Sequence, residues 1–147
     1  MRTTVKRLVL SAALTTGLIG AFPATANAYS ATAICGSDGY SYTVLTSSPV
    51  TAPNGTVVGT VYLAYSSGNG ENCVVTIKSS YVGSSTWTGA DLTVQNVGDF
   101  YDNNNYSYYA GPVRKYAAGH CVKYQGIMNM SDGTTATGGN SAWNYCN

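Results

Sequence analysis

The feature that most restricts the fold is the apolar pattern, which is short, alternating and repeatedly interrupted. Residues 56–65 and 73–78 place apolar side chains at every second position, as a half-buried strand does. Beyond residue 28 no segment carries a helical apolar stripe. Between the runs stand clusters of Gly, Asn and Asp, which supply the positive φ of tight turns, at residues 52–55, 67–70, 131–133 and 137–140. The pattern predicts an all-β protein, a small antiparallel β-sandwich or barrel.

About seven strands are expected. They are predicted at residues 40–46, 56–65, 73–78, 90–97, 106–116, 121–128 and, more weakly, 142–146. Pro112 lacks a backbone donor, so the strand at 106–116 is predicted to be an edge strand or to carry a bulge. The short connection at 117–120 predicts a hairpin with His120 at its turn. The Asn-rich segment Asp99–Asn105 is interpreted as a polar, mobile loop.

The first 28 residues predict a secretory signal peptide. Arg2, Lys6 and Arg7 precede an uncharged, mostly apolar run at 8–22, which is shorter than the roughly 20 residues that span a bilayer. Ala26-Asn27-Ala28 then supplies the small residues of a cleavage site. We therefore expect cleavage after Ala28 and a secreted single domain at 29–147.

Charge is sparse beyond the predicted leader. Three of the seven Lys and Arg residues lie in the leader, which leaves four against six Asp and Glu residues, a net charge of −2. Recognition of a polyanion depends on clustered Lys and Arg. We expect no nucleic-acid partner, no membrane association after cleavage, and no cofactor.

Four cysteines follow the leader: Cys35, Cys73, Cys121 and Cys146. Paired thiols persist in the oxidising environment that an exported protein meets. No close Cys-x-x-Cys pair suggests a structural zinc site, so two disulfides are predicted and no metal site. Of the three possible connectivities the preferred one joins Cys35 to Cys73 and Cys121 to Cys146, and the spacing leaves the other two open.

No catalytic residue is assigned. His120 beside Cys121 suggests a nucleophile and its base, but adjacent strand residues point to opposite faces and a disulfide-bonded cysteine has no thiolate. Asp99 and Asp102 are the acids considered for a glycosidase, which needs two carboxylates about 5 to 10 Å apart. The same segment offers oxygen ligands for calcium but lacks the glycine and terminal glutamate of an EF-hand.

The tyrosines are the most unusual feature of the composition, and all 13 follow residue 28. Tyrosine suits half-exposed strand surfaces, where its ring packs and its hydroxyl reaches water. The functional alternative is an adhesive or carbohydrate-stacking surface. Its candidate stacking residues are Trp87, Tyr101, Tyr106 and Tyr108.

Four motifs carry a resemblance to a known family. They are CGSDGY at 35–40, GENCVVTI at 70–77, YAGPV at 109–113 and GHCVKY at 119–124. In order and spacing they resemble the spore-associated protein A family of streptomycetes and related actinobacteria, over nearly the whole chain beyond the leader. This chain departs from the family pattern at Tyr124-Gln125-Gly126, where a Trp-Gly-Gly type of sequence is expected. The resemblance implies a small exported protein found with aerial hyphae and spores, and it implies no enzymatic motif.

The leading functional hypothesis is a secreted, non-catalytic protein of the spore or hyphal surface that acts by binding or as a structural component. Its expected partner is the spore or cell-envelope surface, including polysaccharide. The alternative is a carbohydrate-binding module or an inhibitor of a secreted enzyme. A cell-wall glycosidase is the third hypothesis, and it requires Asp99 or Asp102 to face a second acid across a cleft.

Overall fold

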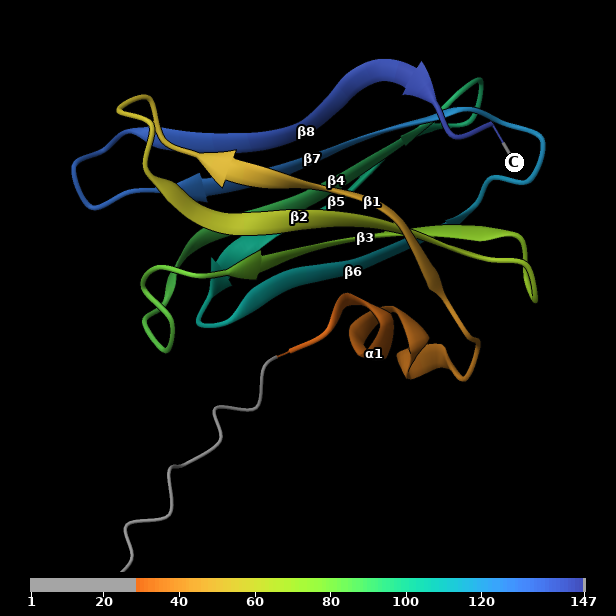
Figure 1. The fold of residues 1–147 in the computed structure, drawn as a ribbon, viewed down its shortest axis with the longest axis horizontal. Helices are drawn as coiled ribbons and strands as arrows, with labels where there is room; N and C mark the ends of the chain where they lie inside the picture. Colours follow the sequence, from red (N-terminus) through yellow and green to blue (C-terminus); the bar gives the residue numbers. More distant parts are fainter. Residues whose placement is uncertain (1–28, 147) are drawn as a thin grey trace, which may run out of the picture.

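Eight strands and one short helix make up the computed structural model, which describes residues 29–146 (Figure 1). The predicted leader lies outside the described residues. A single helical turn, α1 (Ala31–Cys35), continues into a 3-10 turn at Gly36–Asp38. The strands are β1 (Thr43–Thr51), β2 (Val57–Ser66), β3 (Glu71–Lys78), β4 (Thr86–Val94), β5 (Gly98–Tyr106), β6 (Tyr109–Tyr116), β7 (Val122–Asn129) and β8 (Thr135–Asn144).

All eight strands belong to one antiparallel sheet that curls into a nearly closed barrel. Their order in the sheet is β5-β4-β7-β8-β1-β2-β3-β6, so β5 and β6 are the two edges. The predicted all-β class is confirmed, with eight strands where about seven were expected. Pro112 lies on edge strand β6 beside a shift in the β3–β6 register, as its missing N–H predicts.

Side chains, rather than a backbone ladder, join the two edges along the line that we call the seam. The Asp102 carboxylate on β5 accepts the Gly111 N–H of β6 at 2.8 Å and also the hydroxyl proton of Tyr106. At one end of the barrel the buried Lys78 ammonium donates to the carbonyl of Tyr106 at 2.9 Å. Further along the seam, the Lys115 ammonium of β6 lies 4.6 Å from the centre of the Phe100 ring of β5. The seam therefore uses three of the chain's few charged groups.

Inward-facing side chains fill the barrel. The largest fully buried ones are Leu63, Leu92 and Met128, surrounded mostly by valines. Gly126 stands among them on β7, and a Cβ there would lie 2.6 Å from Val61 Cβ and 2.7 Å from Thr76 Oγ1. A glycine at this position lets opposite walls of the barrel approach each other.

Helix α1 covers the outer face of β2, β3 and β6 (Figure 1). It begins at Ser30, whose hydroxyl accepts the Ala33 N–H. Its last carbonyls, those of Ile34 and Cys35, accept hydrogen bonds from the Arg114 guanidinium, which also forms an ion pair with Asp38 at 3.4 Å. The short helix was not predicted, and it is held in place by tertiary contacts because a single turn is unstable alone.

The preferred disulfide pairing is confirmed: Cys35 is bonded to Cys73 and Cys121 to Cys146. The first bond fastens α1 to β3, and the second ties the start of β7 to the end of the described chain. Within residues 29–146 no helix has the length and apolar character needed to cross a membrane.

Three local predictions are wrong. Asp99–Asn105 is not a loop, because it lies in β5, which pairs with β4 from Gly98 to Tyr106. Residues 137–140 are not a turn, because their glycines lie inside β8. Residues 117–120 do form a turn, with His120 N–H donating to the Ala117 carbonyl, but β6 pairs with β3 and β7 with β4 and β8, so the turn closes no hairpin.

Candidate functional site

The structure separates the four predicted stacking residues. Trp87 and Tyr101 point outward from β4 and β5 and are 42% and 71% exposed. Tyr106 packs against the barrel core and donates its hydroxyl to Asp102. The Asp102 acceptor and burial raise the pKa of Tyr106 to about 12. Tyr108 stands in the turn between β5 and β6. The four rings therefore form no single row.

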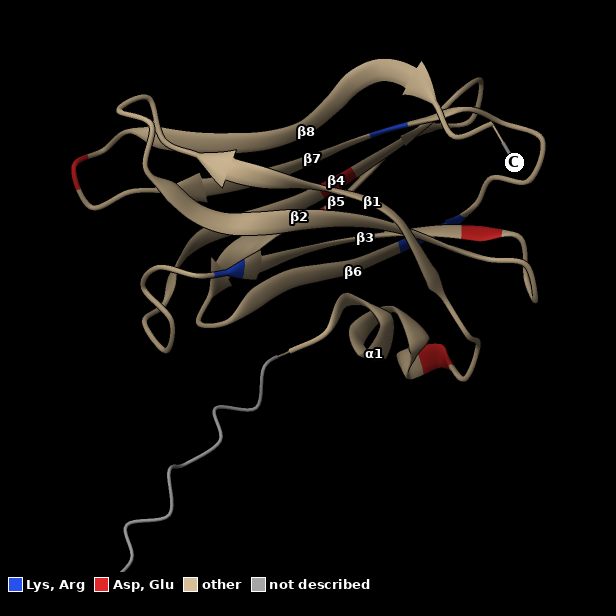
Figure 2. Cartoon of the chain, viewed as in Figure 1, with Lys and Arg blue, Asp and Glu red and all other residues tan. Residues whose placement is uncertain are grey.

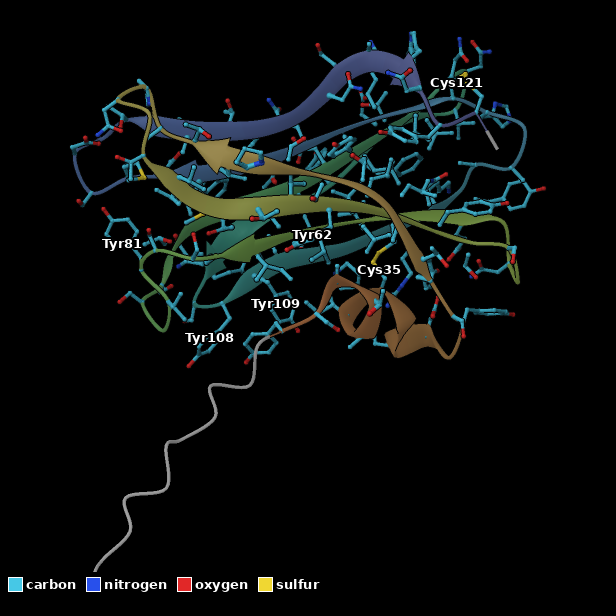
Figure 3. All side chains as sticks on the ribbon, viewed as in Figure 1. Cys35, Tyr62, Tyr81, Tyr108, Tyr109 and Cys121 are labelled. Carbon is cyan, nitrogen blue, oxygen red and sulfur yellow. A yellow bond between two sulfur atoms is a disulfide. The ribbon has the colours of Figure 1, made fainter. Side chains whose placement is uncertain are left out.

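Tyr108 belongs to a separate aromatic cluster at the beginning of the described chain. The Tyr29 ring lies 5.3 Å from the Tyr108 ring and 5.0 Å from the Tyr109 ring, measured between centroids. Figure 3 shows Tyr108 and Tyr109 on the side of the barrel that carries α1. This cluster packs the N-terminal segment onto the barrel.

His120 and Cys121, which were considered and rejected as a base and a nucleophile, do not form such a pair. Cys121 is consumed by its disulfide with Cys146, and His120 is partly exposed in the turn before β7. The two acids considered for a glycosidase also face different ways: alternation along β5 turns Asp99 outward and Asp102 toward the seam. Among residues 29–146 no group of three or more His, Cys, Asp or Glu side chains is placed to hold a metal ion.

The outer face of β5, β4, β7 and β8 carries a hollow. Register places Tyr101, Asp91, Gln125 and Gly139 in one row across these four strands. A groove of about 390 Å³ lies over the Asp91, Gln125 and Gly139 members of this row, and we call it the outer groove. It is lined by Asp91, Thr93, Lys123, Gln125 and the β8 segment 137–141.

Two glycines of β8 leave this hollow open. A Cβ at Gly138 would overlap the Pro49 carbonyl oxygen, and a Cβ at Gly139 would overlap the Tyr124 carbonyl oxygen. Neighbouring backbones therefore approach so closely that no side chain fits at either position. The polar side chains of β4 and β7 form the opposite wall. The groove is therefore bounded by main-chain atoms along the β8 glycines and by side chains along β4 and β7.

The charges at the outer groove balance locally. Burial raises the pKa of the Asp91 carboxyl, the Asn103 side chain beside it acts in the opposite direction, and the Asp99 charge raises the pKa further. Asp91 Oδ1 and Asn103 Oδ1 are both buried, and no donor from residues 29–146 forms a hydrogen bond with either. Lys123 is the groove's cation, with its ammonium 4.1 Å from the centre of the Trp143 ring. Figure 2 shows acidic and basic positions scattered along the ribbon.

Tyr101, one of the predicted stacking residues, is the neighbour of Asp91 on β5, whereas the groove residues Asp91, Gln125 and Lys123 were not predicted. A signal was present, because alternation places Asp91 on the polar face of residues 90–97 and Gln125 on the polar face of residues 121–128. Which strands are neighbours could not be deduced from these patterns.

Comparison with known proteins found one similarity. The chain is 37% identical over 113 residues to spore-associated protein A of Streptomyces coelicolor. The match covers 76% of this chain and 62% of the relative, so the chain spans less than two thirds of that protein's length. No family model and no solved structure matches.

Proposed function

Because the chain is a homologue of spore-associated protein A, we propose that it is a secreted, non-catalytic protein that associates with the surface of spores or hyphae and acts there by binding. The homology carries the proposal, since the name of the relative states an association with spores. The two disulfides support an extracellular site of action, because such bonds persist in oxidising compartments. The outer groove is the binding site that the geometry favours.

Fractionation tests this proposal directly. A tagged chain with its leader is expressed in a sporulating Streptomyces strain, and immunoblots compare washed spores, washed hyphae and culture fluid. The same leader fused to a small reporter protein serves as the control for trapping. We expect the tagged chain to be retained on spores or hyphae after washes that release the reporter. Recovery of the chain only from the culture fluid would refute the proposal.

Glycoside hydrolysis is a second candidate function, and one observation favours it. Asp91 and Asp99 lie on the same outer face of neighbouring strands, in diagonal positions. Such positions are about 7–8 Å apart, which is within the separation of paired glycosidase carboxylates. Burial raises the pKa of Asp91, as a general acid requires, while Asp99 is exposed.

A hydrolysis assay separates the two candidates. Release of reducing ends from peptidoglycan or chitin is measured for the native chain and for the Asp91→Asn and Asp99→Asn variants. The non-catalytic proposal expects no release above a heat-denatured control. Release that either substitution abolishes would establish the hydrolase instead.

A further inference from the structure

The outer groove has the size and polarity of a small-ligand site. Its volume of about 390 Å³ lies within the roughly 300–1,000 Å³ of typical ligand pockets. The lining combines a carboxylate, an amide, an ammonium and several hydroxyls: Asp91, Gln125, Lys123, Thr93, Thr137 and Ser141. Such a set donates and accepts many hydrogen bonds within a short span, and a polyhydroxylated ligand matches it.

The groove also lies beside flat aromatic surface. Tyr101 is the register partner of Asp91 and is 71% exposed, so its ring is available above the β5 side. Trp143 is 40% exposed on the β8 side, where the Lys123 ammonium rests on its ring. A pyranose ring presents an apolar face of C–H groups and a rim of hydroxyls. The aromatic rings can stack on the apolar face of such a sugar, and the polar floor between them can hydrogen-bond to its hydroxyls.

The electrostatics of the groove favour a neutral ligand. The lining carries one carboxylate and one ammonium, and the ammonium is already engaged with Trp143. A polyanion needs several clustered cations, and the residues beyond the leader contain only four Lys and Arg in all. The groove lacks that cluster.

Polar side chains of the groove can bind sugar hydroxyls. Asp91 lines the groove, but its Oδ1 is buried beside Asn103 and lies out of reach of a ligand, so any contact with a sugar comes from the other oxygen of the carboxylate. Gln125 is opposite Asp91 in the register and is exposed, so its amide can both donate to and accept from a neighbouring hydroxyl.

We propose that the outer groove binds a neutral pyranose polymer, with the Tyr101 ring stacking on a sugar and Asp91 and Gln125 bonding its hydroxyls. This inference rests on the proposed function as a surface-binding protein and adds the ligand class and the residues. Tyr101 and Gln125 determine affinity, and Trp143 extends the stacking surface at the far end.

Pull-down with insoluble polymers tests the proposal. Residues 29–147 are incubated with cellulose and chitin as the neutral polymers, and with peptidoglycan, whose peptide stems carry carboxylates, and heparin–agarose as the anionic ones. The Tyr101→Ala, Gln125→Ala double variant is compared with Tyr116→Ala, which removes an exposed tyrosine of β6 from outside the groove. Near-ultraviolet circular dichroism verifies that each variant is folded.

The expected result is binding to at least one neutral polymer, at least tenfold weaker in the double variant and unchanged in Tyr116→Ala. Binding to no neutral polymer, preferential binding to heparin, or equal losses in both variants would overturn the inference. The fractionation experiment keeps the two proposals distinguishable. If washed spores retain the double variant to the same extent as the native chain, the groove proposal is refuted and the proposed surface association stands.

Discussion

Asp102→Ala should destabilise the barrel specifically at its seam. The substitution removes an acceptor that holds the Gly111 N–H at 2.8 Å and the hydroxyl of Tyr106. Hydrogen bonds to charged groups contribute about 1.5–3 kcal/mol each, and an unpaired backbone donor at a partly buried site costs about 1–3 kcal/mol. Because Tyr106 can turn its hydroxyl toward water, we expect a loss of about 2–4 kcal/mol in the free energy of unfolding.

Urea unfolding at neutral pH measures this loss, with Asp99→Ala as the matched control. Asp99 lies on the same strand and carries the same charge, but it is exposed on the outer face, so its removal should change stability by less than about 0.5 kcal/mol. Asp102→Asn keeps a neutral acceptor and should fall between the two. Hydrogen exchange at the Gly111 amide should accelerate in Asp102→Ala. Equal stabilities of the Asp102→Ala and Asp99→Ala variants would refute the assignment of Asp102 to barrel closure.

Three further predictions concern the core, the alkaline limit and the second disulfide. Gly126→Ala introduces a Cβ 2.6 Å from Val61 Cβ and should cost about 1–3 kcal/mol in urea unfolding; native stability would contradict the close approach of the barrel walls. Because the pKa of Tyr106 is raised to about 12, the folded phenol keeps its proton between pH 10 and 12 while the unfolded one loses it. The free energy of unfolding should therefore fall as pH rises through that window, and Tyr106→Phe should reduce the fall between pH 10 and 11.5 in urea unfolding. Equal pH dependence of the free energy of unfolding in the variant and the native chain would contradict this role of Tyr106. Removing Cys121 and Cys146 together opens a loop of sequence separation 25 and should cost about 3 kcal/mol, seen as a lower thermal midpoint under non-reducing conditions; an unchanged midpoint would be the contrary result.

The parts of the fold that could be predicted are those where one local pattern suffices. In β2, alternation of branched apolar residues with small or polar ones selects a buried face, and the turn residues at 67–70 join β2 to β3. This hairpin does not depend on knowing which distant strands become neighbours. The preferred disulfide pairing is present in the structure, although the sequence left the other two connectivities open.

Strand β5 shows why the rest could not be predicted. Its Asp and Asn residues have low intrinsic strand preference, yet nine of its residues pair with β4, because β-propensity depends strongly on the neighbouring strand. Asn105 is exposed on the outer face, Asn103 lies beside Asp91 of β4, and Asp102 has a defined partner in β6. The local composition contains none of these facts.

The candidate site was harder still. Tyr101, Asp91, Gln125 and Gly139 share a row only because β4 pairs with β7 and β7 with β8, an order that skips along the chain. Each residue alone is an ordinary polar or small residue on a strand. A site spread over four strands is visible only after the sheet order and register are known.

The seam also determines where the barrel can open transiently. Strands β5 and β6 are consecutive and are joined by Ser107 and Tyr108. The covalent chain therefore holds the two strands together at one end of the seam. Lys78 reinforces that pinned end through its bond to the Tyr106 carbonyl. The opposite end is fastened by the stacked contact of Lys115 on Phe100, which is exposed to screening by salt. Separation of β5 from β6 should therefore begin at the Lys115 end of the seam. The amplitude of this separation should increase with ionic strength.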